Sequence, residues 1–208
     1  MRRGMTAEAL KQFMLEQGPS RNTVNMEWDK IWAVNKQILD PVVPRYTCIN
    51  KATAVKLTVE NGPATPEART QTLHPKNADV GVKAVMFGRN LIIESEDAKT
   101  VEVGQKVTLM KWGNATITRR EVVGDSYELF ATIDEEDKNF KGTTKLTWIC
   151  NDPATTCEIR MVEFDHLITK DKVEETDDNE DIFNKNSRFE DVGIAEGIVK
   201  TLTKGSYF

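Results

Sequence analysis

The stretch KVTLMKWGNATITRREVVGDSYELFATI, residues 106–133, contains three runs of β-branched and apolar residues separated by two turn signals. The first signal is WGN at residues 112–114, and the second is VGD at residues 123–125. Glycine beside Asn or Asp between such runs is typical of a turn that joins adjacent strands. The stretch therefore predicts three consecutive antiparallel strands, and it decides the fold class.

Further strands are predicted on both sides of this meander. Apolar and polar residues alternate in the same way at residues 53–59, 145–150 and 156–164. Residues 60–70 are polar and punctuated by Pro and Gly, which predicts a loop. Because no long helical pattern separates the strands, they favour an antiparallel barrel or sandwich over a parallel α/β sheet. The predicted fold class is mainly β.

Two helices are predicted before the strands begin. Thr6 is suited to cap the first helix, and the second is predicted to begin at Asn25. The second helix is expected to end before Pro41, because proline lacks the N–H that the helix ladder needs. Its apolar stripe, interrupted by Asn35, is expected to pack into a core. The stripe comprises Trp28, Ile31, Trp32, Ile38 and Leu39.

The change of pattern near Pro44 predicts two regions of different structure. The helical period is lost at this proline, and sequence typical of strands follows it. The prediction is a helical subdomain at residues 1–43 and a β-barrel region at residues 44–208.

The charge of the chain is unevenly distributed. Its 208 residues carry a net charge of −5, which alone argues against a nucleic-acid partner. Residues 171–181, DKVEETDDNED, hold seven acidic residues and one lysine, so they contribute −6 and the remainder sums to +1. This acidic stretch is expected to form a solvated loop. A near-neutral remainder is compatible with a local basic face.

The sequence contains no recognisable site for catalysis or for a metal ion. Its three cysteines lack CxxC spacing and its two histidines lie far apart, so neither a disulfide framework nor a metal site is predicted. No P-loop or G-x-S-x-G motif occurs, and Glu135 and Glu136 fall in a polar turn where solvated side chains are expected. With no apolar run long enough for a membrane span and no targeting signal, a cytoplasmic location is expected.

Basic residues stand beside aromatic residues or at strand ends at several points. Unpaired RNA bases are bound by arginine side chains and by stacking on aromatic or guanidinium planes, so this pattern suits RNA binding. Unrelated surface charges would give the same pattern, because such residues are common at strand ends, and composition leaves both interpretations open. The candidate RNA-binding residues are Arg2, Arg3, Arg45 beside Tyr46, Lys111 beside Trp112, Arg119 and Arg120.

Strand alternation makes a further prediction for the two adjacent arginines. Side chains along a strand point to opposite faces in turn. Simple alternation places Arg119 on the same face as Ile117 and Arg120 on the opposite face, so the two cations are not expected to share one surface.

Several segments resemble one known family. MRRGMTAEALKQFMLEQG at residues 1–18 and NMEWDKIWAVNKQILDPVVPRY at residues 25–46 resemble the region that follows the catalytic domain in eukaryotic cytosolic glutamyl-tRNA synthetases, including the glutamyl half of the fused glutamyl-prolyl enzyme. Further landmarks follow in the order typical of that family. They are HPKNADVG at 74–81, VTLMKWGNATIT at 107–118, TTKLTW at 143–148, DHLITK at 165–170 and NKNS at 184–187.

The resemblance implies a class I synthetase fragment, in which a helical stem-contact subdomain precedes two β-barrels that bind the anticodon. The parent enzyme would activate glutamate with ATP and magnesium and transfer it to tRNA(Glu). The catalytic signatures of the family lie upstream, so no catalytic or cofactor-binding residue is expected in this chain. By similarity to the glutaminyl enzyme, Arg3 corresponds to a base-reading arginine, and basic hairpin residues correspond to Lys111 and to Arg119 or Arg120.

The resemblance also leaves alternatives open. Glutaminyl-tRNA synthetase is similar in fold and shares the RRG start, so it is a second candidate parent. A protein–protein scaffold module is a third interpretation, because synthetases of this kind join multi-synthetase complexes. The expected partners are tRNA(Glu), the upstream catalytic domain and such a complex. The family continues past Phe208 into basic strands that close the barrel, so an incomplete barrel is expected at the C-terminus.

Overall fold

The computed structural model describes residues 4–22, 26–124, 126–170 and 173–208, which fold into two compact units. The first unit comprises Met1–Tyr46, Arg69–Val85 and Thr201–Phe208. The second comprises Thr47–Ala68 and Met86–Lys200. Within the described ranges no helix is long and apolar enough to cross a membrane.

Two helices form the N-terminal part of the first unit. Helix α1 spans Ala7–Glu16, and Thr6 caps it as predicted, because its hydroxyl accepts a hydrogen bond from the backbone N–H of Ala9. Helix α2 spans Trp28–Leu39 and is preceded by Glu27. The predicted cap, Asn25, lies outside the described residues. The helix pair buries Ala9, Ile31, Val34 and Asn35.

Trp28 does not take the place that the apolar stripe predicted for it. Its side chain is 64% exposed, whereas Ile31 is buried and Trp32 is half-buried. Trp28 is the first residue of α2, so no preceding helical turn covers it. The prediction that both tryptophans belong to the core is therefore wrong for Trp28.

A buried histidine fixes the corner that follows α2. Lys76 donates its backbone N–H to Nδ1 of His74, so Nε2 carries the proton and donates to the carbonyl of Asp40 at 2.8 Å. The Asn77 amide donates to the carbonyl of Pro41. These bonds join the corner to the segment that contains β3 (Glu67–Thr72), the short 3-10 helix η1 (Ala78–Val80) and β4 (Val82–Phe87).

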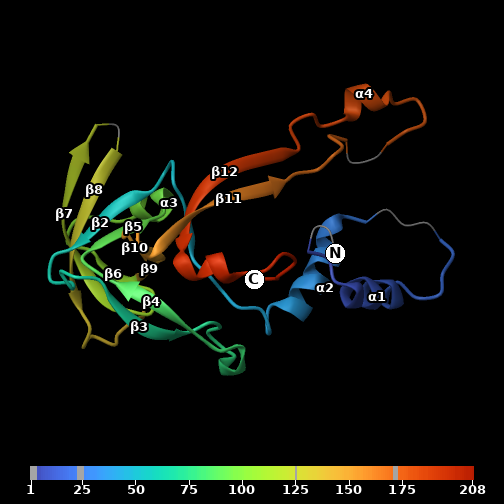
Figure 1. The fold of residues 1–208 in the computed structure, drawn as a ribbon. Coiled ribbons are helices and arrows are strands. Elements are labelled where there is room, and N and C mark those ends of the chain that lie inside the picture. The colour runs from blue at the N-terminus through green and yellow to red at the C-terminus, as the bar shows by residue number, and fades with distance from the viewer. Residues whose placement is uncertain (1–3, 23–25, 125, 171–172) are drawn as a thin grey trace. The chain divides into compact units, whose positions relative to one another are not determined.

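The second unit is built on a seven-stranded sheet that nearly closes into a barrel (Figure 1). The strand order is β10-β5-β2-β8-β7-β6-β9. The edge strands β9 and β10 are separated only by Thr147, so one stretch of chain joins both edges of the sheet. The bounds are β2 Val55–Val59, β5 Asn90–Ile93, β6 Lys106–Leu109, β7 Gly113–Val123, β8 Ser126–Asp134, β9 Thr144–Leu146 and β10 Trp148–Cys150.

Large side chains fill the interior of this barrel. Phe87, Trp112 and Trp148 pack edge-on or tilted, with ring centroids 5.0–5.1 Å apart. Each indole N–H is satisfied: Trp112 donates to the Glu135 carboxylate and Trp148 to the carbonyl of Met110. Edge-to-face packing combined with paired indole groups stabilises a core beyond its buried area.

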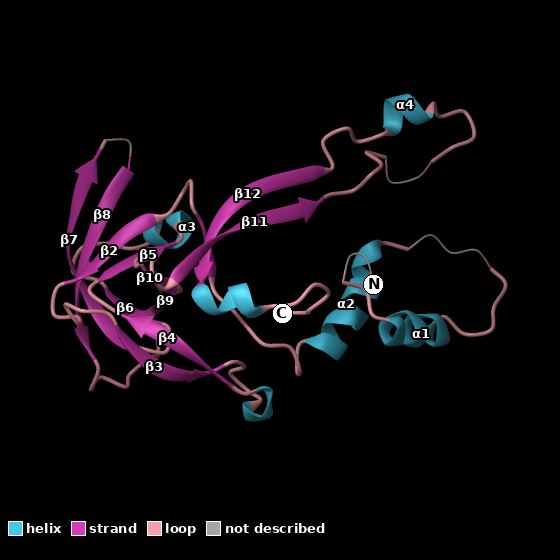
Figure 2. Ribbon diagram, in the orientation of Figure 1, coloured by secondary structure: helices cyan, strands magenta, loops and turns pink. Residues whose placement is uncertain are grey.

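A second sheet, two short α-helices and a 3-10 helix follow in the described chain (Figure 2). Strand β12 lies between β1 and β11, and the hairpin of β11 and β12 extends away from the barrel, with residues 165–170 and 173–187 at its far end. The strands of this second sheet are β1 Cys48–Asn50, β11 Thr156–Phe164 and β12 Arg188–Glu196. The remaining elements are α3 Ser95–Lys99, α4 Asn179–Ile182 and η2 Gly197–Thr201.

The mainly β fold and the three-strand meander are confirmed. Strands β6, β7 and β8 follow one another as antiparallel neighbours. Two details differ from prediction. The sheet is mixed, because β2 pairs with β8 and β6 pairs with β9 in parallel. Residues 67–70, at the end of the stretch predicted as a loop, form the first part of β3, which pairs with β4.

The predicted faces of the two adjacent arginines are also wrong. Ile117 pairs with Ala131 and Arg119 pairs with Phe130, so Thr118 is an extra residue that forms a β-bulge. The bulge reverses the alternation. Arg120, and not Arg119, therefore lies on the face of Ile117.

Candidate nucleic-acid interface

The described chain begins at Gly4, directly after the two N-terminal arginines. Arg2 and Arg3 lie outside the described residues. Gly4, which comes directly after them, has a φ of +82°, in the left-handed region that favours glycine. A side chain added at Gly4 would meet the ring of Tyr207, so the two ends of the described chain lie close together in the first unit.

Arg45 belongs to a basic and aromatic cluster in the first unit. Its guanidinium pairs with Asp40 at 2.6 Å, and its backbone carbonyl accepts a hydrogen bond from the ammonium of Lys83. The same ammonium lies 5.4 Å from the centre of the Tyr46 ring. The edge of that ring meets Phe208, with centroids 6.1 Å apart. Arg45 thus supports the corner while half of its side chain stays exposed.

This cluster has the elements that an unpaired nucleotide requires. Phe208 is exposed and can offer a ring face to a base, while Arg45 offers guanidinium N–H groups to a phosphate or base edge. We define the terminal cluster as Gly4, Arg45, Tyr46, Lys83, Tyr207 and Phe208.

Lys111 lies in the tight turn between β6 and β7. It is exposed and has a φ of 64°, the one positive φ at a non-glycine residue in the described chain. The neighbouring Trp112 points inward and is only 6% exposed. Trp112 therefore belongs to the barrel core, and its interpretation as an exposed stacking partner for RNA is wrong.

Arg119 and Arg120 stack on rings of the neighbouring strand, on opposite faces of the sheet. The guanidinium of Arg119 lies 3.8 Å from the centre of the Phe130 ring, and that of Arg120 lies 3.7 Å from the Tyr127 ring. Arg119 also pairs with Glu121 at 3.3 Å and lies near Glu60 at 3.8 Å.

The two arginines therefore differ in how much charge they offer to RNA. The carboxylates of Glu60 and Glu121 beside Arg119 offset part of its charge. In the part of the chain that the structure describes, no ion pair joins Arg120. Of the two, Arg120 is the better placed to contact a phosphate.

The structure does not bring all the predicted residues into one site. Lys111 precedes the start of β7 and Arg119 lies in its second half. At ~3.3 Å per residue, the strand from its first residue, Gly113, to Arg119 spans roughly 20 Å. Within the second unit, the candidate cations therefore lie before the start of β7 and in its second half, and the two arginines lie on opposite faces of the sheet.

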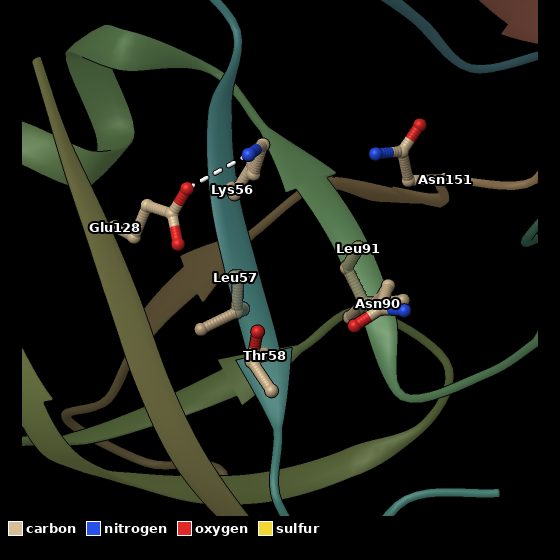
Figure 3. A pocket seen from close by; sticks show the side chains of 7 residues that line it. All are labelled: Lys56, Leu57, Thr58, Asn90, Leu91, Glu128 and Asn151. Atoms are coloured by element: carbon tan, nitrogen blue, oxygen red, sulfur yellow. Dashed lines mark hydrogen bonds and ion pairs between the residues drawn. The ribbon is translucent and has the colours of Figure 1, made fainter. Parts of the chain in front are cut away.

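A polar hollow of about 300 Å³ lies on the outer face of the barrel (Figure 3). Its one ion pair, between Lys56 and Glu128 at 2.8 Å, is internally neutral, so the hollow offers no excess positive charge to a phosphate. Its lining consists of Lys56, Leu57, Thr58, Asn90, Leu91, Glu128 and Asn151. Elsewhere in the described ranges, no three His, Cys, Asp or Glu side chains are grouped so that they could hold a metal ion.

Sequence reasoning missed Lys83 and Phe208 as members of the terminal cluster. Lys83 is only 5% exposed, although alternation in the segment VKAVMF would place the lysine outside. The last residues, SYF, carried a weak signal, since two aromatic residues in a polar tail are unusual for a solvated segment.

A comparison with protein families finds a match to the central part of the chain. Residues 43–134 match the family described as tRNA synthetases class I (E and Q), anti-codon binding domain. The matched residues include the corner at Arg45 and strands β2 to β8.

Similarity to individual proteins extends over almost the whole chain. The bifunctional glutamate/proline–tRNA ligase of Mus musculus is 41% identical over 208 residues, which is 99% of this chain and 14% of the mouse protein. The cytoplasmic glutamate–tRNA ligases of Saccharomyces cerevisiae and Arabidopsis thaliana are each 39% identical, over 98% and 99% of this chain. The chain spans only 28% and 29% of those two proteins.

Proposed function

We propose that the chain recognises the anticodon of tRNA(Glu), because residues 43–134 match the anticodon-binding domain family of the class I tRNA synthetases for glutamate and glutamine. The observation that carries the proposal is the similarity of nearly the whole chain to glutamate–tRNA ligases. The terminal cluster supports it, because cations and an exposed ring meet there.

The proposed parent protein is a cytoplasmic glutamate–tRNA ligase. Its relatives in yeast and Arabidopsis carry that name. In this proposal an upstream catalytic domain of the same protein binds ATP with magnesium, activates glutamate and transfers it to tRNA(Glu). The present chain supplies recognition at the other end of the tRNA, with residues 1–43 as a stem-contact subdomain and residues 44–208 as the anticodon-binding region.

Six residues are proposed to contact the tRNA, with different roles. Arg3 is proposed to read a base, and Arg45 to support the corner and reach the tRNA backbone. Lys111 and Arg120 are proposed to contact phosphates, because each carries an exposed cationic group. Arg2 and Arg119 complete the set, although the carboxylates beside Arg119 reduce what it can contribute.

Binding to matched tRNAs tests this proposal. The full-length protein that carries this chain is titrated with tRNA(Glu), with the same tRNA altered at the anticodon, and with tRNA(Gln). We expect the tightest binding to tRNA(Glu) and a loss of affinity as salt rises, because bound cations release counterions from phosphates. Equal affinity for tRNA(Glu) and its anticodon variant would contradict anticodon recognition. Preference for tRNA(Gln) would instead identify a glutaminyl parent.

Exposed apolar residues on the helices favour one second function. Met14, Leu15 and Trp28 are each more than 60% exposed. Such side chains suit contact with another protein, as in a multi-synthetase complex. Replacing the three by Ser, Gln and Gln should leave tRNA affinity unchanged and abolish association with the complex. Unchanged association would contradict the scaffold function.

A further inference from the structure

Three polar side chains line the hollow on the outer barrel face without a hydrogen bond to any described residue. They are the amides of Asn90 and Asn151 and the hydroxyl of Thr58. Thr58 and Asn90 stand directly opposite each other on β2 and β5. The backbone at the same place is paired, since Asn151 donates its N–H to the carbonyl of Asn90 at 2.8 Å. The groups that a ligand can bind in this hollow are therefore side-chain donors and acceptors.

The hollow exists because a short side chain lies between longer ones. Thr58 pairs with Asn90 on one side and with Phe130 on the other, so the three share the outer face. The Lys56 side chain leaves the hollow open, because it is directed at Glu128 on β8 (Figure 3). The volume of about 300 Å³ lies at the lower end of the range for ligand pockets, and it leaves room for one nucleobase.

A guanidinium plane lies next to the hollow on the side of β8. Phe130 carries the guanidinium of Arg119 at 3.8 Å from the centre of its ring. The carboxylates of Glu121 and Glu60 lie 3.3 and 3.8 Å from that guanidinium and restrict its orientation. Because stacking uses the plane of a guanidinium, the carboxylates that reduce its value for a phosphate leave this use intact.

These groups fit an uncharged, planar ligand. The ion pair of Lys56 and Glu128 is internally neutral, so a phosphate finds no excess positive charge in the hollow. A carboxamide, in contrast, offers a donor and an acceptor side by side, which is the pattern with which asparagine binds the edge of a base. The Thr58 hydroxyl adds one further donor or acceptor.

We propose that the hollow holds one unpaired nucleobase of the anticodon loop, with its edge on the Asn90 amide and the Thr58 hydroxyl and its plane beside Arg119. The inference rests on the proposed function, which supplies tRNA as the ligand. Unpaired RNA bases are bound in this manner, by stacking combined with hydrogen bonds to their edges. The inference adds Asn90 and Thr58 to the residues proposed to contact the tRNA, and it gives Arg119 the role of a stacking plane.

Titration of the full-length protein with tRNA(Glu) tests the inference. Asn90→Ala removes the amide, and Thr58→Phe fills the hollow. Each should weaken binding about tenfold, the size of one good base contact, and the double variant should bind little more weakly than either, because both changes act on the same site. The urea midpoint of each variant checks that it is folded.

Asn186→Ala is the matched control. The Asn186 side chain is also exposed and without a hydrogen bond to any described residue, but it lies at the far end of the β11–β12 hairpin. Its replacement should leave the affinity for tRNA(Glu) unchanged.

Salt and abasic tRNAs separate a base contact from other contacts. Asn90 is uncharged, so Asn90→Ala should leave the slope of log affinity against log salt unchanged, whereas loss of a phosphate contact lowers that slope by about one. Variants of tRNA(Glu) that lack one base of the anticodon loop at a time identify the bound base. With one of these tRNAs Asn90→Ala should have no further effect, because the hollow is already empty.

The outcomes are distinguishable. If the native protein does not prefer tRNA(Glu) over its anticodon variant, the proposed function fails and this inference fails with it. If that preference is present, but Asn90→Ala and Thr58→Phe bind like the native protein or Asn90→Ala weakens binding to every abasic tRNA alike, this inference alone is overturned. A loss of affinity in folded variants that leaves the salt slope unchanged and disappears with one abasic tRNA supports it.

Discussion

Lys111 adopts a left-handed backbone conformation that most side chains avoid. Its φ of 64° is least favourable for a β-branched residue, whereas Asn adopts this conformation more readily than most residues. We therefore expect Lys111→Val to be less stable than Lys111→Asn by about 1–2 kcal/mol, although both variants lose the ammonium group. Urea unfolding of the two variants measures the difference.

The matched control for this comparison is Lys141, which is exposed and is not among the residues with positive φ. Val and Asn at position 141 should differ by less than about 0.5 kcal/mol. A difference at position 111 no larger than the one at 141 would show that the turn is unstrained. In that case the charge of Lys111, and not its backbone conformation, would explain why a lysine stands at this position.

At the residue scale, the sequence predicted chemistry better than exposure. Thr6 acts as the predicted cap because capping depends on residues three apart in the chain. Exposure depends on what the fold brings from elsewhere. Trp112 is buried because Phe87 and Trp148 approach it from other strands, and Asn35 is buried because residues 4–6 return to it.

The bulge in β7 makes a prediction at the scale of the element. Thr118 is the extra residue between two regular stretches of pairing with β8. Deletion of Thr118 should leave Ile117 paired with Ala131 and Arg119 paired with Phe130. It should therefore lower the free energy of unfolding by only about 1 kcal/mol. Deletion of Thr116 instead moves Thr118 into the buried position of Ile117. The free energy of unfolding should then fall by about 2–4 kcal/mol. Urea midpoints of both deletions test this, and equal costs would contradict the assigned bulge.

The loop between β8 and β9 provides a pH-dependent test. Asp137 accepts hydrogen bonds from the Lys106 ammonium at 2.8 Å and from the backbone N–H of Asn139, and these, with the Asn114 amide, lower its pKa to about 2. A carboxyl with a lowered pKa in the folded state stabilises the protein above about pH 4, and this stabilisation is lost as pH falls toward 2. Asp137→Asn should therefore lose less stability than the native chain between pH 5 and 2.5.

Glu136→Gln is the control for this pH dependence. The Glu136 carboxyl is adjacent to Asp137 and exposed, and within the described residues its side chain forms no hydrogen bond. The urea midpoint of the control should fall with acid as in the native chain. Parallel pH profiles for the native chain and Asp137→Asn would mean that Asp137 does not hold the loop.

At the element scale, strands were predictable but their pairing was not. Period-two alternation identified β2, β6, β7, β8 and β11, because it is a local property of the chain. The bulge and the parallel pairs depend on the closure of the barrel, to which β9 and β10 contribute opposite edges. Lys83 is buried in β4 against its apparent alternation, because the carbonyl of Arg45 and the ring of Tyr46 provide partners for its ammonium.

In the proposed function, the net charge of the chain affects both the rate and the affinity of RNA binding. The net charge is −5, while residues 171–181 alone contribute −6. Long-range repulsion of RNA by this segment would be sequence-independent, and salt would screen it. In the proposed function, the anticodon preference depends instead on local contacts with the bases. The two contributions can therefore be separated by altering the acidic segment alone.

Replacing Glu174, Glu175 and Glu180 by glutamine changes the net charge from −5 to −2 and leaves intact the pair of Asp177 with Lys170. We expect the affinity for tRNA(Glu) to rise about threefold at 50 mM salt and to match the native value near 0.5 M, because the Debye length shrinks to a few ångströms. The ratio of affinities for native and altered anticodons should not change at either salt concentration. A changed ratio would place the acidic segment at the recognition site, and an unchanged affinity at low salt would show that its charge is too distant to act on the RNA.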